Sequence, residues 1–314
     1  MKKKISILIT IAVILLGAII VLFFHPDNAL KKNNLNNDIA FLTKLAEQGD
    51  MKAQTDLGTV YVNKKSPDYT KAIYWYNKAA QQNYAPAQFN LGLIHAHGEG
   101  GIKDLKRARE YYYKAASQGF ASAQINLGGL LINGIGGNID YDQALDLFTK
   151  AAKSNNPVAM YNLGHIYHSG LGRPKDDIQA ARWYIKAADL GSIASKNSLA
   201  LFYAQGLGNL PVDKDKAFKL LKDSASQGYA VAQNNLGILY SDGTDETPQN
   251  YIQSYAWFSV AFYNGHQEAD ASRKLIMQKL KGSEIEKAKV LSTHYEKKYT
   301  PTLNNNGTNK LYEH

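Results

Sequence analysis

Residues 159–191 read AMYNLGHIYHSGLGRPKDDIQAARWYIKAADLG, and this stretch predicts the fold of most of the chain. Ala159, Leu163 and Tyr167 follow one another at intervals of four residues, which places them on one face of a helix. Two glycines then interrupt that helix, and Asp176 is of the residue type that begins another one. The stretch therefore predicts two helices joined by a short glycine-containing turn.

The same pattern recurs along the chain, which indicates an array of repeats. Its Leu-Gly pair returns every 34 to 37 residues, once as Leu199-Ala200. The leucines of this pair are Leu57, Leu91, Leu127, Leu163, Leu199 and Leu236. An Ala-Ala pair, or a looser version of it, follows in phase, and a large apolar residue stands four positions before that pair. These large residues are Trp75, Tyr111, Leu147, Trp183, Leu220 and Trp257.

Helix boundaries are written into each unit. We expect an N-cap side chain to accept hydrogen bonds from amides that the second helix leaves unpaired. The candidates are Asp68, Asp104, Asp140, Asp176, Asp213 and Asn250. Only Gly or Asn occurs just after the second helix, as a left-handed cap requires. These positions are Asn83, Gly119, Asn155, Gly191, Gly228 and Gly265.

The glycine inside the first helix of each unit needs a physical reason, because glycine there costs about 0.5–1 kcal/mol relative to alanine. We expect the neighbouring helix to approach so closely that a methyl group would clash. The large apolar residues of the second helix would then pack over the dent.

The N-terminus has a different composition from the repeats. Lys2, Lys3 and Lys4 precede an apolar run over residues 5–24, which is long enough to span a bilayer as a helix. A cleavable signal peptide would have a shorter apolar region and small residues before the cut. The run therefore predicts an uncleaved anchor over residues 1–25, with the lysines in the cytoplasm and the rest outside; cleavage is the alternative.

The repeat is similar to the SEL-1-like repeat, a relative of the tetratricopeptide repeat. The fourth unit carries the resemblance in Leu163-Gly164, Asp176, Trp183-Tyr184 and Ala187-Ala188. The resemblance covers about 260 residues and implies an all-α, right-handed solenoid of about six two-helix repeats. Members of this family serve as adaptors in envelope signalling, polysaccharide export, protein quality control and host-cell entry.

The predicted organisation is as follows. An N-terminal signal-anchor or transmembrane segment covers residues 1–25, and a linker covers 26–37. The SEL-1-like solenoid covers 38–298, with units starting near residues 53, 87, 123, 159, 195 and 232. Capping helices are expected at 38–48 and 269–298, and a flexible tail at 299–314.

Composition and motifs argue against chemistry. The chain has 314 residues, a net charge of +9 and no cysteine, so disulfides and thiolate metal sites are excluded. No run of five or six basic residues occurs, and we expect no nucleic-acid partner. The glycine-rich turns follow no strand and lack Gly-Lys-Ser/Thr. We expect no catalytic residue, no metal and no cofactor. Cysteine-rich relatives, some described as binding penicillin or hydrolysing β-lactams, differ in this respect.

One polar series is the candidate binding site. The residue two before the Leu-Gly glycine is Asp56, Asn90, Asn126, Asn162, Ser198 or Asn235. Stacked repeats would align these residues as a ladder on the concave wall, where amides bond to the main chain of an extended peptide. The alternative is that each one forms a bond inside its own repeat. Nearby groove positions, Gln88 and Gln124 among them, would set partner choice.

The predicted function is that of a membrane-tethered, non-enzymatic adaptor. It would bind a protein or peptide on the concave surface, with Asn90, Asn126, Asn162, Asn235, Gln88 and Gln124 as the candidate contacts. The expected location is the bacterial inner membrane, single-pass, with the N-terminus in the cytoplasm and the solenoid in the periplasm or exterior. The alternatives are a secreted virulence-type factor acting on a host protein, and an enzyme acting on β-lactams or the cell wall.

Overall fold

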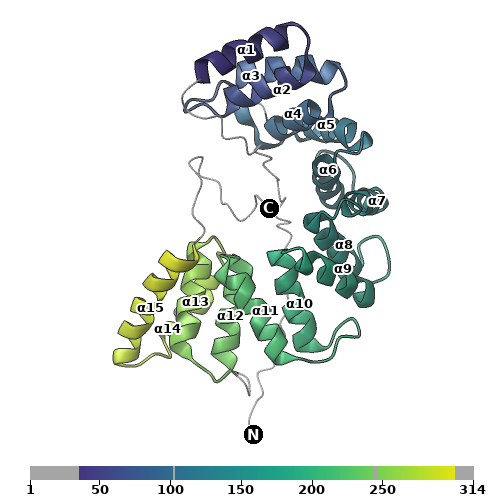
Figure 1. Cartoon of the computed structure of the whole chain (residues 1–314). Helices are drawn as coiled ribbons and strands as arrows, with labels where there is room; N and C mark the ends of the chain where they lie inside the picture. Colours follow the sequence, from purple (N-terminus) through teal and green to yellow (C-terminus); the bar gives the residue numbers. More distant parts are fainter. Residues whose placement is uncertain (1–34, 102, 244–246, 301–314) are drawn as a thin grey trace. The chain divides into compact units, whose positions relative to one another are not determined.

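The computed structural model describes residues 35–101, 103–243 and 247–300, and these residues form helices joined by short turns (Figure 1). No β-strand occurs in this part of the chain. The described residues divide into two compact units, the first ending at Leu147 and the second beginning at Phe148. The prediction of an all-helical solenoid is confirmed.

Unit 1 consists of two-helix repeats preceded by a single helix. Here α2 packs against α3, and α4 against α5, as the first and second helices of one repeat each (Figure 1). The bounds are α1 Leu35–Glu47, α2 Met51–Val62, α3 Tyr69–Gln81, α4 Ala85–His97, the 3-10 turn η1 Glu99–Gly101, α5 Leu105–Ser117, α6 Ala121–Asn133 and the first part of α7 Tyr141–Ala152.

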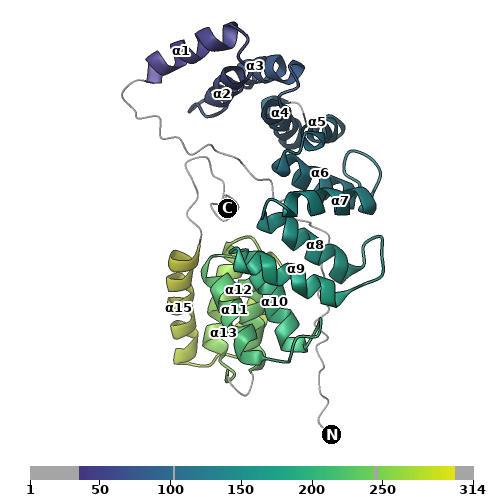
Figure 2. The same cartoon turned by 45° about the vertical axis from the view of Figure 1, so that its right-hand side comes forward.

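Unit 2 continues the pattern and ends it. The pairs α8–α9, α10–α11 and α12–α13 each form one repeat, and α15 lies alongside α13 (Figure 2). The bounds are α8 Pro157–Ser169, α9 Asp177–Asp189, α10 Ile193–Gln205, α11 Lys214–Ser226, α12 Ala230–Asp242, α13 Tyr251–Tyr263, α14 Ala269–Met277 and α15 Ser283–Tyr299.

The predicted helix boundaries are confirmed. The side chain of each predicted N-cap residue accepts a hydrogen bond from the amide three residues ahead, at 2.8–3.0 Å. The residue after each second helix has a positive φ, from 56° at Asn155 to 99° at Gly265. Asn and Gly are the residues that adopt this conformation at low cost. Each turn is therefore specified by its own local sequence.

Close packing on the helical glycine is confirmed, but a different aromatic residue provides it. A Cβ added to Gly92 would lie 2.5 Å from Cε1 of Tyr112, and one on Gly164 would lie 2.5 Å from Cε1 of Tyr184. The predicted contact was the residue one position earlier, such as Trp75. Trp75 packs instead against Ala46 of α1 and Leu57 of α2. Successive positions on a helix point about 100° apart, so only one of them reaches the glycine.

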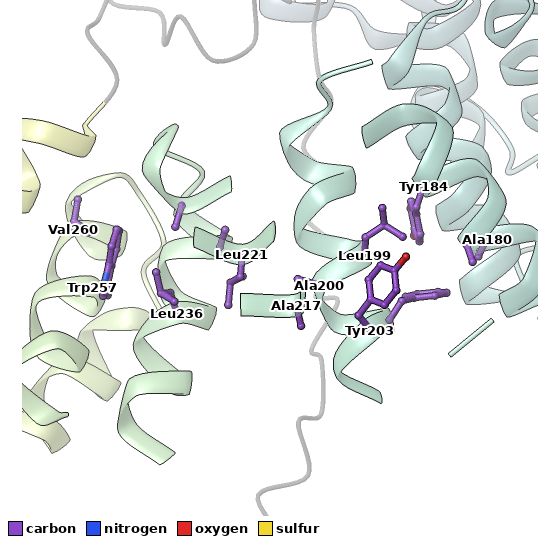
Figure 3. Close-up of a cluster of buried hydrophobic side chains, with 14 residues drawn as sticks. Ala180, Tyr184, Leu199, Ala200, Tyr203, Ala217, Leu221, Leu236, Trp257 and Val260 are labelled. Carbon is purple, nitrogen blue, oxygen red and sulfur yellow. The ribbon is translucent and has the colours of Figure 1, made fainter. Parts of the chain in front are cut away.

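The buried core of unit 2 runs through successive repeats as one continuous cluster (Figure 3). Tyr184 of α9, Leu199 of α10, Leu221 of α11 and Leu236 of α12 all belong to it, each with less than a tenth of its surface exposed. Each repeat buries its apolar face on the next one, which is how a solenoid obtains its stability.

The last repeat is closed by the C-terminal helices. Trp257 of α13 packs against two tyrosines of α15, with ring centroids 4.6 Å from Tyr295 and 5.1 Å from Tyr299. The main-chain carbonyl of Tyr299 accepts hydrogen bonds from the side-chain amides of Gln233 and Asn264, both at 3.2 Å. The end of α15 therefore closes this repeat where no further repeat follows.

The predicted anchor at residues 1–25 lies outside the described residues, as does the tail from residue 301. Among the described helices, none combines the length and the apolar character needed to cross a membrane. α1 begins at Leu35, inside the segment expected to be a linker.

Candidate protein-binding face

Charge is distributed unequally between the two helices of each repeat. The first helices (α2, α4, α6, α8, α10 and α12) carry few charged side chains, and these balance: Lys52, Asp56, Lys196 and Asp242. Lys52 pairs with Asp56 at 2.8 Å, and Lys196 pairs with Asp223 of α11 at 2.7 Å. The second helices carry many more, as in α5 with Lys106, Arg107, Arg109, Glu110 and Lys114. In a chain of net charge +9, the first helices are therefore an uncharged, amide-rich surface.

The six ladder positions, defined above as Asp56, Asn90, Asn126, Asn162, Ser198 and Asn235, all lie in the middle of first helices. In unit 1, Asn90 is half-buried and interacts with the hydroxyl of Tyr76, which also lies 3.0 Å from the Thr59 hydroxyl. Asn126 is 2% exposed, makes no well-aligned hydrogen bond among the described residues, and interacts with the Tyr112 hydroxyl. These two asparagines thus serve the contact between repeats.

In unit 2 the ladder residues are less engaged. Ser198 interacts with the hydroxyls of Tyr161 and Tyr184, as the unit 1 asparagines do with theirs. Asn162 is half-buried, and the structure gives its side chain no hydrogen bond within the described residues. Asn235 is also half-buried and donates from Nδ2 to Oδ1 of Asn197 at 3.0 Å. Asn162 and Asn235 therefore keep amide groups accessible to a partner.

The difference follows from a residue that the sequence reasoning overlooked. The second-helix aromatic that packs on the glycine stands fourteen positions before the next ladder residue. It is Tyr76 before Asn90, Tyr112 before Asn126 and Tyr184 before Ser198. Before Asn162 it is Phe148, and before Asn235 it is Leu221, and neither has a hydroxyl. A spacing of fourteen residues between tyrosine and asparagine was the available signal.

Burial raises the pKa of these tyrosines. It raises the pKa of Tyr112 far above its ordinary value of about 10, and the interaction with Asn126 opposes that rise. Burial likewise raises the pKa of Tyr184 well above that value, with Ser198 opposing. The hydroxyls therefore stay protonated, and each remains able to donate to the ladder residue of the next repeat.

The glutamines predicted to set partner choice lie beneath the surface. Gln88 is 3% exposed and Gln124 is 4% exposed. The side-chain amide of Gln124 donates to the carbonyl of Ala116, and that of Gln88 to the carbonyl of Ala80, which joins each first helix to the end of the preceding second helix. Gln118 also donates to Oε1 of Gln88 at 2.7 Å. Partner binding by these two glutamines stays a prediction, and their burial counts against it.

An open pocket of about 670 Å³ lies between two successive turns of unit 2, before α9 and before α11. Its carboxylate at Asp177 is shared by His168, whose Nδ1 is 2.7 Å away, and by Lys175, whose Nζ is 3.2 Å away. The Arg173 guanidinium lies over the ring of Tyr167 at 5.5 Å. These contacts fix the turns. No group of three or more metal-ligating side chains occurs in the part of the chain that the structure describes.

Comparison with known proteins supports the repeat assignment over most of the chain. The Sel1 repeat matches six times in succession, at residues 52–84, 85–120, 121–156, 157–192, 194–229 and 230–266. The chain belongs to the Sel1 repeat family. Proteins of this family are in general protein-interaction scaffolds without catalytic activity.

Two solved structures resemble the Sel1 chain over most of its length. One is c5321, a protective antigen of uropathogenic Escherichia coli strains with an SLR fold: it is 30% identical, with a TM-score of 0.76 over 84% of this chain and 57% of that one. The other is a Sel1 repeat protein from Oxalobacter formigenes, 32% identical, with a TM-score of 0.66 over 76% of this chain and 97% of that one.

Curated relatives match over shorter segments. The rat DAP3-binding cell death enhancer 1 is 46% identical over 46 residues, which are 15% of this chain and 9% of that protein. The ERAD-associated E3 ubiquitin-protein ligase component HRD3 of Candida glabrata is 31% identical over 84 residues, 27% of this chain and 10% of that protein. The chain thus spans about a tenth of the length of these relatives.

Proposed function

We propose that this chain is a membrane-tethered scaffold that binds a protein partner on the first-helix face. The observation that carries the proposal is the sorting of polar groups in this face. Its few charges are balanced, whereas amides recur in the ladder positions and remain accessible at Asn162 and Asn235. Hydrogen-bonding groups that are spared from internal pairing are available for recognition.

Site-specific photocrosslinking in cells tests the choice of face. A photoreactive residue at position 162 on α8 should capture a discrete partner. The matched control is the same residue at position 182 on α9, where Arg182 is exposed on a second helix of the same repeat. Capture from position 182 but not from position 162 would assign binding to the second helices and refute the proposal.

The tether is proposed from the sequence alone. The apolar run at residues 5–24 follows three lysines, a combination that supports a single-pass helix in the bacterial inner membrane. The repeats would then face the periplasm or the exterior. Membrane fractionation combined with mass spectrometry of the mature N-terminus tests this arrangement. A soluble chain beginning after residue 25 would instead support the secreted alternative.

A further inference from the structure

The ladder residues differ in what the fold requires of them. Asn90, Asn126 and Ser198 each meet a tyrosine hydroxyl from the preceding second helix. Asn162 and Asn235 occupy the same repeat position, but Phe148 and Leu221 offer them no hydroxyl. An architectural role therefore explains the polar residue in the first group and leaves it unexplained in the second.

Asn162 and Asn235 flank a polar centre on three successive first helices of unit 2. Asn197 and Ser198 of α10 lie between them in the repeat order. The bond from Asn235 to Asn197 and the interaction of Ser198 with Tyr161 of α8 show that these helices are neighbours at this level. Neighbouring packed helices are about 8–10 Å apart, so Asn162 and Asn235 are separated by roughly 16–20 Å. An extended peptide covers that length with about six residues.

Charge limits the kind of segment that fits. On α8, α10 and α12 the charged side chains are Lys196, which is paired with Asp223, and Asp242 at the end of α12. Burial lowers the pKa of His165, and His168 lowers it further, so His165 is neutral at physiological pH. A charged ligand would find no unpaired counter-charge beside Asn162.

The chain itself contains an example of the expected recognition. The amides of Gln233 and Asn264 both donate to the main-chain carbonyl of Tyr299, a residue from a helix outside the six repeats. Gln233 lies on α12, two positions before Asn235. Side-chain amides of this array thus hold a peptide carbonyl that a separate segment brings to them.

We propose that Asn162 and Asn235 bind the main chain of an extended, uncharged segment of about six residues in the partner protein. Each asparagine amide offers a donor and an acceptor, which match the C=O and N–H of one peptide unit. Asn197 and Ser198 line the interval between them. This inference rests on the proposed function and adds to it the chemistry of the partner and the residues that select it.

Peptide selection on the full-length protein in detergent tests the inference. A phage-displayed library of random dodecapeptides should yield binders without charged residues over the contact segment. Asn162→Ala and Asn235→Ala should each weaken the affinity of a selected peptide about tenfold, which corresponds to about 1.4 kcal/mol. The control Asn90→Ala should leave the affinity unchanged. Methylation of single peptide nitrogens should abolish binding at the nitrogens that face the asparagines.

A second variant separates recognition from architecture. Phe148→Tyr restores the hydroxyl that other repeats direct to the ladder residue, so it should occupy Asn162. We expect its melting temperature to stay level or rise, and its peptide affinity to fall as in Asn162→Ala. Unchanged peptide affinity in both Asn162→Ala and Phe148→Tyr overturns the inference.

A library that gives no binder, or only charged binders, also counts against the inference. A lower melting temperature in Asn162→Ala without loss of affinity would assign Asn162 to the architecture. Crosslinking from position 162 can still succeed in each of these cases, so the scaffold proposal is tested separately.

Discussion

The second repeat and the last repeat place an aromatic ring on the same glycine position but complete the contact differently. In the second repeat Tyr112 packs on Gly92, and its hydroxyl interacts with Asn126 of the following repeat. In the last repeat Phe258 packs on Gly237 without a hydroxyl. There the neighbouring Trp257 is covered by the tyrosines of α15.

The difference separates two functions of the repeat. The ring on the glycine joins the two helices inside a repeat, and both repeats need it. The polar link joins one repeat to the next and is used only where a repeat with a suitable partner follows. At the end of the array, aromatic stacking by α15 replaces that link, because an exposed final face would otherwise remain open to water.

The largest expected effect concerns the covered tryptophan. Trp257→Ala should cost about 3–5 kcal/mol of unfolding free energy, because Trp257 is 3% exposed and removing it leaves a cavity beneath α15. The matched control is Trp183→Ala, at the same repeat position. Trp183 is only half-buried and has Lys186 at 4.7 Å from its ring, so its loss should cost less. Chemical denaturation measures both, and equal losses would contradict a special role for α15.

A smaller effect tests the glycine contact. Gly92→Ala adds a Cβ that would lie 2.5 Å from the Tyr112 ring, and overpacking of this kind costs about 1–3 kcal/mol. Better helix propensity returns about 0.5–1 kcal/mol, so a net loss of stability should remain. Gly129→Ala is the control, since nothing lies within 4 Å of its added Cβ. It should gain about 0.5–1 kcal/mol, and a gain at Gly92 as well would refute the close contact.

Much of the fold follows from local sequence. The caps and turns were predicted because each depends on one or two residues with a fixed backbone preference, as at Asp104 or Gly119. The aromatic residue that packs on the glycine was misassigned, because Tyr111 and Tyr112 are both large and only the helix rotation distinguishes them. The contact of α15 with Trp257 lies outside the repeat pattern, so periodicity carried no information about it.

The candidate site was predictable in position but not in use. The ladder series was visible as a recurring polar residue, yet whether a given asparagine is engaged depends on a side chain fourteen residues earlier. Asn126 is buried beside Tyr112, whereas Asn162 follows Phe148 and stays accessible. The glutamines at Gln88 and Gln124 looked accessible because they vary between repeats, but they hold carbonyls at helix ends.

The hydroxyl of the second repeat should have a moderate effect. Tyr112→Phe keeps the ring on Gly92 and removes the group that faces Asn126, which should cost about 1 kcal/mol. Tyr113→Phe is the control on the same helix, because Tyr113 is 55% exposed. Its unfolding free energy should not change. Equal values for the two variants would show that the polar link adds nothing to the contact between repeats.

The smallest effect is a dependence on pH that differs between the interior and the end of the array. Burial lowers the pKa of His165, and His168 lowers it further. Burial also lowers the pKa of His266, but there Glu268 acts in the opposite direction. As the pH falls below the ordinary histidine value of about 6.5, the unfolded chain takes up protons before the folded one does.

Stability should therefore decrease as the pH falls through that value, and the decrease should stop below the pKa of the folded state. His165→Gln should flatten the decrease more than His266→Gln, because no carboxylate offsets the burial of His165. Thermal unfolding between pH 8 and pH 5 measures both variants. A steeper profile in His165→Gln than in the unchanged protein would reverse the sign and show that His165 is protonated in the folded state.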